Sequence, residues 1–476
     1  MTTSTIDVAG LEGAPLGLTS EQLDDLDSRL EGPLLRAGDR GWDEAVLVWN
    51  GMVAKAPALV VQPASALDVA VTVGFARAQG LVLSVKGGGH NMAGTAIAER
   101  GLTLDLSRMR ELTVDPEARL AQVGPGCRLK DVDRATQEHG LATVLGFVSE
   151  VGVAGLTLGG GLGYLARRFG WTVDNLEEVE IVTADGEIRT ANRDENADLH
   201  WAVRGGGGNF GVVTRFTFRV HEVGPTITGG LIVWSADRID EVLATYRGLT
   251  ESAPRELTAG VTVRLAPPAP FLPEEWHGKP IVGLLVCHSG AEAEADLAPI
   301  RALTGSIADL ITEKPYTDQQ SMLDGMEPKG HHYYWKTEYL AGVSQEFLDA
   351  FRDSALKVTS PLSESVIVHL AGALNERADD DGAVGNRDAR YMSAFAGQWT
   401  PGAGDEEHVE WVRDAWASIR PFSTGGNYLN FQTADEDEGR LRATYGSNFE
   451  RLVKVKETYD PDNLFRTNRN IRPRSR

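Results

Sequence analysis

The chain has 476 residues, of which 42% are apolar and 24% charged, and its formal net charge is −22. This length is too great for one ordinary core and predicts two or three packed units. The negative charge repels phosphate backbones and argues against nucleic acid as a partner, and no apolar run is long enough to span a membrane.

Compartment and redox state follow from the N-terminus and the cysteines. The sequence MTTSTIDVAG has no basic head followed by an apolar stretch, so we expect no signal peptide and a cytoplasmic location. Cys127 and Cys287 are the only cysteines, and we expect two free thiols in a reducing compartment. The acidic composition leaves open whether the protein is adapted to salt.

A short helix is predicted near the N-terminus. Residues 1–20 are expected to form a loose arm. Thr19 and Gln22 then stand at the spacing of a capping box. The helix is expected to run to about Arg29.

The next segment is predicted to form a β-α-β unit. Strands are expected at 58–62 and 81–85, with a helix at 67–79 between them that ends at Gly80. The second strand leads directly into Lys86-Gly87-Gly88-Gly89-His90-Asn91. Three glycines after a strand let consecutive N–H groups point at one spot and bind phosphate oxygens. Taken alone, the motif fits a plain glycine turn with a surface histidine equally well.

A second unit is predicted to contain a strand at 119–124, a helix at 128–140 and a glycine-dense stretch at 152–170. Glycine costs roughly 1 kcal/mol relative to alanine in a helix, so its density there needs a reason. A backbone that lies against a flat cofactor is favoured over close packing of chain on chain. The glycines concerned are Gly155, Gly159, Gly160, Gly161 and Gly163.

The remaining pattern predicts a change of architecture. A hairpin is expected at 179–190, and 212–220 alternates like a strand with one buried face. The GxGxxG at 206–211 precedes a strand and not a helix, which argues against a dinucleotide-binding Rossmann fold. Residues 225–425 mix alternating strands with helices and predict an antiparallel α+β domain. The tail is expected to contain one long amphipathic helix that stops near Tyr459.

Taken in order, the motifs resemble those of the FAD-linked oxidases of the vanillyl-alcohol oxidase type, in the berberine-bridge-enzyme-like branch. The resemblance covers nearly the whole chain. The matching segments are KGGGHNMAGTA (86–96), LTLDLSRM (102–109), VGPGCRLKDV (123–132), LGGGLGYLARRFGWTVDNL (158–176), WAVRGGGGNFGVVT (201–214), and NYLNF with YDPDNLFRTNRNI in the tail.

The resemblance implies an α+β fold with four parts. An N-terminal arm and helix (1–39) would precede an FAD-binding domain of two α+β subdomains (40–222). An antiparallel-sheet substrate domain with helices (223–425) would follow. The C-terminal segment (426–476) would return to the FAD-binding domain.

The resemblance also implies that FAD is bound covalently, by a single attachment through His90. Many family members have a second tether on a cysteine, but that position is Val148 here, as in the singly attached bacterial branch. Val151 stands where a small valine is associated with oxidases, although it could simply be a core residue. The other residues implied in FAD binding are Lys86, Gly87, Gly88, Gly89, Asn91, Gly94, Gly152, Gly155, Gly159, Gly160, Gly161, Gly163, Val182, Asn468 and Asn470.

Four residues are candidates for catalysis. Tyr428 and Asn430 match the family's Y-x-N motif, and in a strand both side chains would share one face. Tyr428 is expected to accept a substrate proton, which requires a nearby cation or the flavin charge because a free tyrosine has a pKa of about 10. The alternative is a tyrosine packed under the flavin. His369 and Tyr391 are further candidates for a place at the flavin, weighed against purely structural roles.

The implied function is that of an FAD-dependent oxidase. Hydride would pass from a small organic substrate (an alcohol, sugar, amine or secondary metabolite) to flavin N5, and O2 would then accept the electrons and give H2O2. A dehydrogenase of the same fold with another acceptor and a catalytically inactive flavin-binding protein are the alternatives. No metal is expected, because helix or strand spacing cannot place His331 and His332 on one ion. The motifs leave the substrate and the oligomeric state open.

Overall fold

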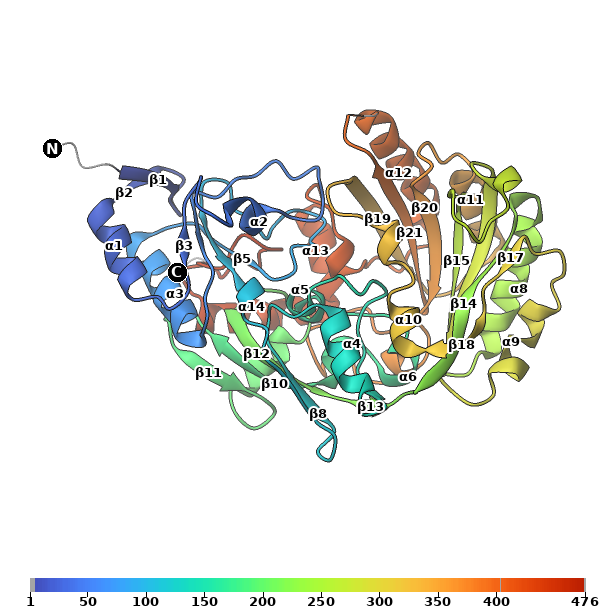
Figure 1. Cartoon of the computed structure of the whole chain (residues 1–476), viewed down its shortest axis with the longest axis horizontal. Coiled ribbons are helices and arrows are strands. Elements are labelled where there is room, and N and C mark those ends of the chain that lie inside the picture. Colours follow the sequence, from blue (N-terminus) through green and yellow to red (C-terminus); the bar gives the residue numbers. More distant parts are fainter. Residues whose placement is uncertain (1–4, 403, 475–476) are drawn as a thin grey trace.

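The computed structural model describes residues 5–402 and 404–474. One half of the molecule, on the left in Figure 1, contains both the first and the last helices of the chain. The other half, on the right, is built on one large sheet with helices on its outer side.

The described N-terminal residues form a hairpin and not a loose arm. β1 (Thr5–Ala9) pairs antiparallel with β2 (Pro15–Thr19), and Val8 and Leu18 are buried. Each strand has only one fully buried residue, which is too little apolar alternation to be recognised in the sequence. Residues 1–4 of the expected arm lie outside the described residues. The predicted capping box of the following helix is present, with both of its hydrogen bonds.

The predicted β-α-β unit is part of a four-stranded sheet with the order β3-β4-β6-β5. Both β4 and β5 run parallel to β6, which lies between them, so the connecting helix α3 crosses over the sheet. Gly80 ends α3 in the left-handed conformation, as predicted. The elements of this half-domain are α1 (Ser20–Ser28), β3 (Leu34–Leu35), α2 (Trp42–Val46), β4 (Leu59–Val61), α3 (Ala66–Gln79), β5 (Leu83–Lys86) and β6 (Leu102–Asp105).

The second half-domain is built on a five-stranded antiparallel sheet, β11-β10-β12-β8-β7. β12 is its central strand and is buried on both faces, so the predicted one-sided burial is wrong. The GxGxxG segment runs directly into β12 and opens no helix. The elements are β7 (Leu112–Asp115), β8 (Leu120–Val123), α4 (Leu129–Gln137), β9 (Leu141–Ala142), α5 (Val153–Leu158), α6 (Ala166–Phe169), β10 (Leu176–Val182), β11 (Ile188–Ala191), α7 (Ala197–Val203), β12 (Val212–Arg219) and β13 (His221–Glu222).

The other half of the molecule is the predicted antiparallel domain. Its sheet has the order β17-β14-β16-β15-β20-β21-β19, and β18 also pairs with β14. The elements are β14 (Thr226–Ser235), α8 (Ile239–Ser252), β15 (Leu257–Leu265), β16 (Pro280–His288), α9 (Ala293–Arg301), β17 (Ala308–Asp309), β18 (Thr312–Pro315), α10 (Tyr316–Gln320), β19 (His332–Leu340), α11 (Gln345–Ala355), β20 (Glu364–His369), β21 (Tyr391–Trp399) and α12 (Asp405–Ile419).

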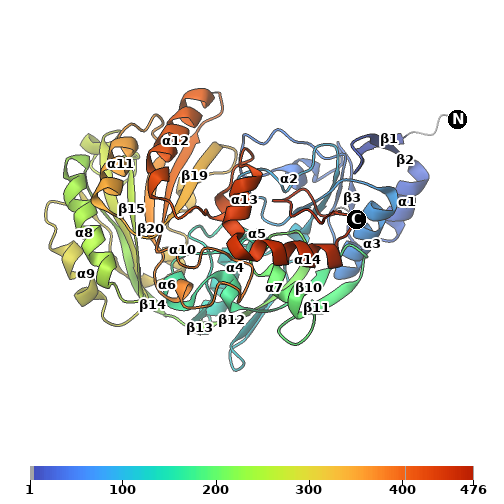
Figure 2. The ribbon, with the colours of Figure 1, turned by 180° about the vertical axis from the view of Figure 1, so that it is seen from behind.

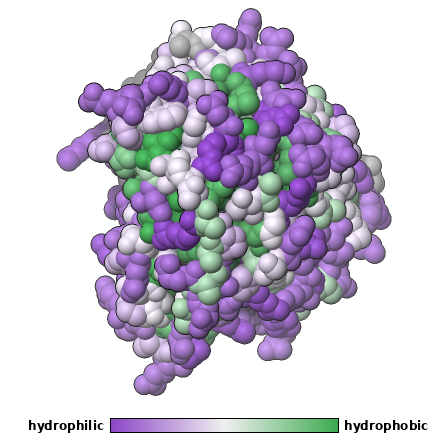
Figure 3. Space-filling view, turned by 90° about the vertical axis from the view of Figure 1, so that its right-hand side faces the viewer, coloured by the Kyte–Doolittle hydropathy of each residue, from purple (hydrophilic) through white to green (hydrophobic). Residues whose placement is uncertain are grey.

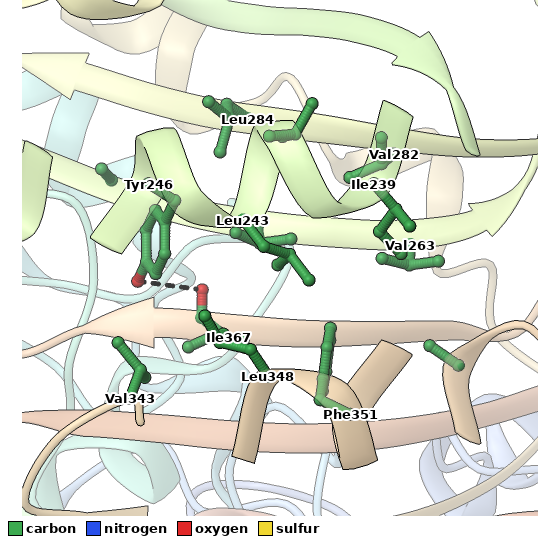
Figure 4. Close-up of a cluster of buried hydrophobic side chains, with 14 of the residues drawn as sticks. Ile239, Leu243, Tyr246, Val263, Val282, Leu284, Val343, Leu348, Phe351 and Ile367 are labelled. Carbon is green, nitrogen blue, oxygen red and sulfur yellow. Dashed lines mark hydrogen bonds between the residues drawn. The ribbon is translucent and has the colours of Figure 1, made fainter. Parts of the chain in front are cut away.

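Helices α8 and α11 cover one face of this sheet, and the core lies between them and the strands (Figure 4). Tyr246 of α8 donates a hydrogen bond to the Ile367 carbonyl at 3.4 Å. Val263 and Ile367 face these helices in the same cluster. Because side chains alternate along a strand, their neighbours Thr262 and Val366 face the first half of the molecule.

The outer side of this domain is mostly hydrophilic, with separate apolar residues between the polar ones (Figure 3). Such scattered apolar residues are normal on a solvated surface. Within the described chain, we find no helix whose length and apolar character would suit it to crossing a membrane.

The tail contains two helices where one was predicted, α13 (Glu438–Tyr445) and α14 (Phe449–Tyr459). Gly446, with a φ of 54°, ends α13 and begins a short 3-10 turn. The end at Tyr459 is as predicted. Leu452 belongs to the same core as the five-stranded sheet, and Figure 2 shows α14 beside α7.

Candidate functional site

A cavity of about 460 Å³ lies between the two halves of the molecule. One wall consists of backbone-rich segments at 87–92, 146–159 and 207–208, together with the tail at 467–469. The opposite wall is the inner face of the eight-stranded sheet. A ligand in this cavity would therefore touch both halves.

Two glycine loops cross at the cavity in direct backbone contact. A Cβ on Gly88 would lie 2.5 Å from the Cα of Gly152, and a Cβ on Gly152 would lie 2.4 Å from the nitrogen of Gly88. Neither position accepts a side chain. By contrast, a Cβ on Gly155 would meet nothing within 4 Å, although Gly155 lines the cavity. The α5 backbone is thus exposed to the cavity, where a flat ring can lie against it.

His90 lies at the end of the loop that follows β5. Its ring stacks on Trp49, with 5.4 Å between the ring centroids, and Trp49 in turn stacks on Tyr333 of β19 at 3.6 Å. Burial, followed by the charges of Lys329 and Arg128, lowers the pKa of His90 to about 4. The imidazole is therefore neutral at neutral pH, the form in which a ring nitrogen has a free lone pair.

Asn50 ties this loop to the eight-stranded sheet. Its Nδ2 donates to the carbonyl oxygens of Met92 and Tyr333, at 2.9 and 3.0 Å, and its Oδ1 accepts from the Tyr333 N–H at 3.1 Å. The position of the His90 loop is therefore coupled to the position of β19.

Lys86, which was expected to help bind the cofactor, holds the loop from beneath. Its side chain is buried, donates to the Ala45 carbonyl at 2.6 Å and pairs with Asp105 at 3.4 Å. The ammonium group is thus engaged outside the cavity. Any contact of Lys86 with a ligand in the cavity would have to come from its backbone.

Tyr428 and Asn430 lie together in the cavity wall, but not on a strand. Leu429–Phe431 forms a 3-10 turn, and this turn, not strand alternation, brings the two side chains together. Asn430 Nδ2 donates to Tyr428 Oη at 2.9 Å and to the Leu156 carbonyl at 2.9 Å. A Cβ on Gly159 would lie 1.9 Å from Asn430 Oδ1, so glycine is required for this approach.

Two opposing effects act on the pKa of the Tyr428 hydroxyl. Burial raises its pKa well above the ordinary value, because a phenolate is poorly solvated there. Hydrogen bonds from Asn430 and from the backbone of Leu162 and Gly161 act in the other direction. A neighbouring cation or the flavin charge was expected to favour ionisation of Tyr428, and no cation of the described residues is among the groups that set its pKa.

The sheet wall changes character along its strands. Val368 pairs with Met392, and both line the cavity near Tyr428. Four residues away along β20, Glu364 pairs with Arg264 of β15 on one side and with Ala396 on the other. The wall is therefore apolar at one end and charged at the other.

The structure corrects the expected place of His369 and Tyr391. Both are buried on the helix-covered side of the sheet, where their rings stack with centroids 5.1 Å apart. Tyr391 shares a hydrogen bond with Thr250 of α8 at 2.9 Å. Burial, with Arg167 and Arg390 nearby, lowers the pKa of His369 to about 2. Neither side chain lines the cavity, so neither can touch a ligand there.

The other predicted site residues divide into two groups. Those that line the cavity are Gly87, Gly88, Gly89, His90, Asn91, Val151, Gly152, Gly155, Gly159, Tyr428, Asn430 and Asn468. Those that lie outside its lining are Lys86, Gly94, Gly160, Gly161, Gly163, Val182 and Asn470. Several of the second group support the walls; a Cβ on Gly163, for example, would lie 1.9 Å from the Leu145 carbonyl. The described residues contain no group of three or more His, Cys, Asp or Glu side chains placed to hold a metal ion.

Trp49 and the charged residues of the cavity were not predicted from the sequence. Thr262 and Arg264 alternate with Val261 and Val263, and this alternation was a signal that a polar strand face looks into a site. Glu327 lies in an irregular segment before β19, and nothing in the local pattern marks it.

Comparisons with known proteins agree with this geometry. Residues 57–192 match the family model of the FAD binding domain, and residues 427–472 match the model described as berberine and berberine like. An FAD-linked oxidoreductase of Dictyostelium discoideum is 30% identical over 93% of this chain and 95% of its own length. The (R)-6-hydroxynicotine oxidase of Paenarthrobacter nicotinovorans is 31% identical over 93% of this chain and 97% of its own.

A solved structure shows the same fold. The crystal structure of 6-hydroxy-D-nicotine oxidase from Arthrobacter nicotinovorans superposes with a TM-score of 0.81 at 28% identity, covering 93% of this chain and 98% of that one. The predicted α+β architecture of an FAD-binding half and an antiparallel-sheet half is thereby confirmed. The chain belongs to the berberine-bridge-enzyme-like family of FAD-linked oxidoreductases.

Proposed function

We propose that this protein is an oxidase that holds FAD covalently through His90 and oxidises a small organic substrate at the expense of O2. The observation that supports this most directly is that His90, the Tyr428–Asn430 pair and the inner face of the sheet all line one and the same cavity. In this proposal residues 40–222 with the tail 426–476 hold FAD, and 223–425 bind the substrate. The buried, unpaired thiols of Cys127 and Cys287 support a cytoplasmic location.

The residues of the cavity fit FAD. Consecutive N–H groups of the loop at 87–91 suit the pyrophosphate, and the open α5 backbone at Gly155 suits the flat ring system. Asn468 Oδ1 and Arg469 Nε are buried at the cavity, and no described residue is a hydrogen-bond partner to either, so both are available to a ligand. When bound, FAD would supply the hydride acceptor and the route of electrons to O2.

The residues of this chain would supply binding, orientation and proton transfer. Tyr428 would accept a proton from the substrate at Oη. Asn430, which also holds the Leu156 carbonyl, would keep that oxygen in place. Apolar side chains such as Val368 and Met392 would exclude water from the same end of the cavity.

Oxidase activity predicts that substrate oxidation consumes O2 and releases H2O2 in equal amounts. Val151 lines the FAD wall of the cavity, and we expect its small side chain to leave room for O2. Val151→Leu should therefore slow reoxidation of the reduced enzyme in air by about tenfold, as about 1.4 kcal/mol added to the barrier would do, with substrate-driven bleaching of the flavin unchanged. Stopped-flow absorbance measures both steps.

The matched control is Val366→Leu, the same change on the opposite wall of the cavity. It should alter the substrate step and leave reoxidation unchanged. Slow reoxidation of the wild type with no peroxide, but fast turnover with a quinone or another artificial acceptor, would show a dehydrogenase. A panel of substrates that never bleaches the flavin under anaerobic conditions would show an inactive flavin-binding protein.

A further inference from the structure

The charged end of the cavity, formed by Arg264, Glu364 and Glu327, has no role in the proposed chemistry. Arg264 is 7% exposed, and its Nη1 lies 3.6 Å from Glu364 Oε2. The same carboxylate oxygen accepts a hydrogen bond from Thr262 Oγ1 at 2.9 Å. Arg264 Nη2 donates to the Leu362 carbonyl at 3.3 Å. Arg264 and Glu364 are therefore fixed against the sheet.

Two groups at this end remain without partners. Arg264 Nε is buried and has no hydrogen-bond partner in the described part of the chain. Glu327 lines the same cavity. Its backbone carbonyl is held by Trp49 Nε1 at 2.9 Å, but we find no hydrogen bond or ion pair to its carboxylate from any described residue. A buried polar group without a partner, such as Arg264 Nε, is costly, and the Glu327 carboxylate faces the cavity, so a ligand that bonds to both gains affinity.

The charges at this end do not balance. Glu327 and Glu364 bring two carboxylates to the cavity, and Arg264 brings one guanidinium. The surplus is negative when both acids are ionised, and it faces a space that is otherwise lined largely by apolar side chains. A cation fits this surplus, whereas an anion would meet two carboxylates for each arginine.

We propose that this end of the cavity binds the protonated amine of an otherwise apolar substrate, with Glu327 and Glu364 as the anionic partners. The amine would lie away from the reacting carbon, because Glu364 is four residues along β20 from Val368 beside Tyr428. At a rise of about 3.3 Å per residue, this separation is about 13 Å. The inference rests on the proposed oxidase function and specifies its substrate class. Arg264 Nε remains available to an acceptor atom beside the amine.

The test compares three probes that differ only in their head group: 4-phenylbutylamine, 4-phenylbutanol and 4-phenylbutyrate. Isothermal titration calorimetry on the oxidised holoenzyme measures their dissociation constants at about pH 9, above the pKa of about 8 to which burial raises Glu327, so that Glu327 and the amine are both charged. We expect the amine to bind at least about tenfold more tightly than either of the other two, as a charge-assisted hydrogen bond would provide. Glu327→Gln should weaken binding of the amine until its dissociation constant equals that of the alcohol.

The matched control is Glu294→Gln, which removes an exposed carboxylate of α9 outside the cavity and should leave all three constants unchanged. A carboxylate that binds most tightly, an amine no better than the alcohol, or a preference that survives Glu327→Gln would each overturn the inference. FAD content reports the folding of the variant. The preference of the wild type for the amine over the other two probes tests the proposal without any variant. Because binding requires no turnover, a failure of the oxidase proposal would be seen separately.

The pH dependence of amine binding provides a second test of the proposal. Burial, followed by the charge of Glu364, raises the pKa of Glu327 to about 8, against the opposing effect of Arg264. Asp324 on the same loop also faces it, and Tyr333 of β19 is nearby. An acid with a raised pKa gains its charge as the pH rises through that value. Binding of the amine should therefore strengthen between about pH 6 and pH 9 in the wild type, and should lose this dependence in Glu327→Gln.

Discussion

Acid-precipitated wild-type protein is expected to stay yellow, while His90→Ala should release all of its FAD into the supernatant. The reason is that His90 lines the cavity with a neutral imidazole whose ring is held by Trp49. The backbone beside His90 is fixed as well, since the backbone N–H of Trp49 donates to the Gly89 carbonyl at 2.9 Å. Absorbance of the pellet and of the supernatant at the flavin maximum measures the two populations.

The control for this change is His221→Ala. Burial also lowers the pKa of His221 to about 4, but its ring stacks on Phe169 outside the cavity, so this variant should keep its flavin. A colourless wild-type pellet would contradict the proposal that FAD is attached covalently.

Peptide mapping should find flavin on the peptide that contains His90 and on no cysteine. Val148 lines the cavity where a second tether would need a thiol. Burial raises the pKa of Cys127 to about 11, and neither Cys127 nor Cys287 lines the cavity. Flavin found on Cys127 would show that the alignment at Val148 is wrong.

The local features of the site were predictable because short-range physics determines them. The β-α-β unit, its capping residues and its terminal Gly80 follow from apolar periodicity and backbone conformation within about thirty residues. The loop after β5 was therefore placed correctly at the end of a strand, and His90 at the end of that loop.

What could not be predicted is which face of each element meets the cavity. For His369, alternation gives two faces, but only the packing of α8 and α11 decides that its face is the covered one. For Tyr428 the pairing with Asn430 was correct and the reason was wrong, because a 3-10 turn and not a strand brings them together. Glu327 meets Arg264 only through the tertiary fold, since about sixty residues separate them in sequence.

Replacing Tyr428 by Phe is expected to have the largest effect on the rate. The change keeps the ring, which packs against Phe431 with centroids 4.9 Å apart and near Met392, and deletes only the hydroxyl. General-base help is typically worth roughly 10²–10⁴ in rate, and we expect substrate reduction of the flavin to slow within that range. FAD content should not change. Anaerobic stopped-flow absorbance measures the reduction step.

The pH profile decides between proton transfer and packing as the role of Tyr428. Burial holds its pKa above the ordinary value, so ionisation needs the hydrogen bonds from Asn430, Gly161 and Leu162 and the charge of a bound partner. If Tyr428 accepts the proton, the wild-type rate should rise with pH through one ionisation that Tyr428→Phe lacks. A substrate that reacts at a neutral amine needs no base, and its own pKa would then shape both profiles. Equal reduction rates for Tyr428→Phe and wild type at every pH would make Tyr428 a packing residue. His369 and Tyr391 do not line the cavity, so neither could then take the place of Tyr428 as the proton acceptor.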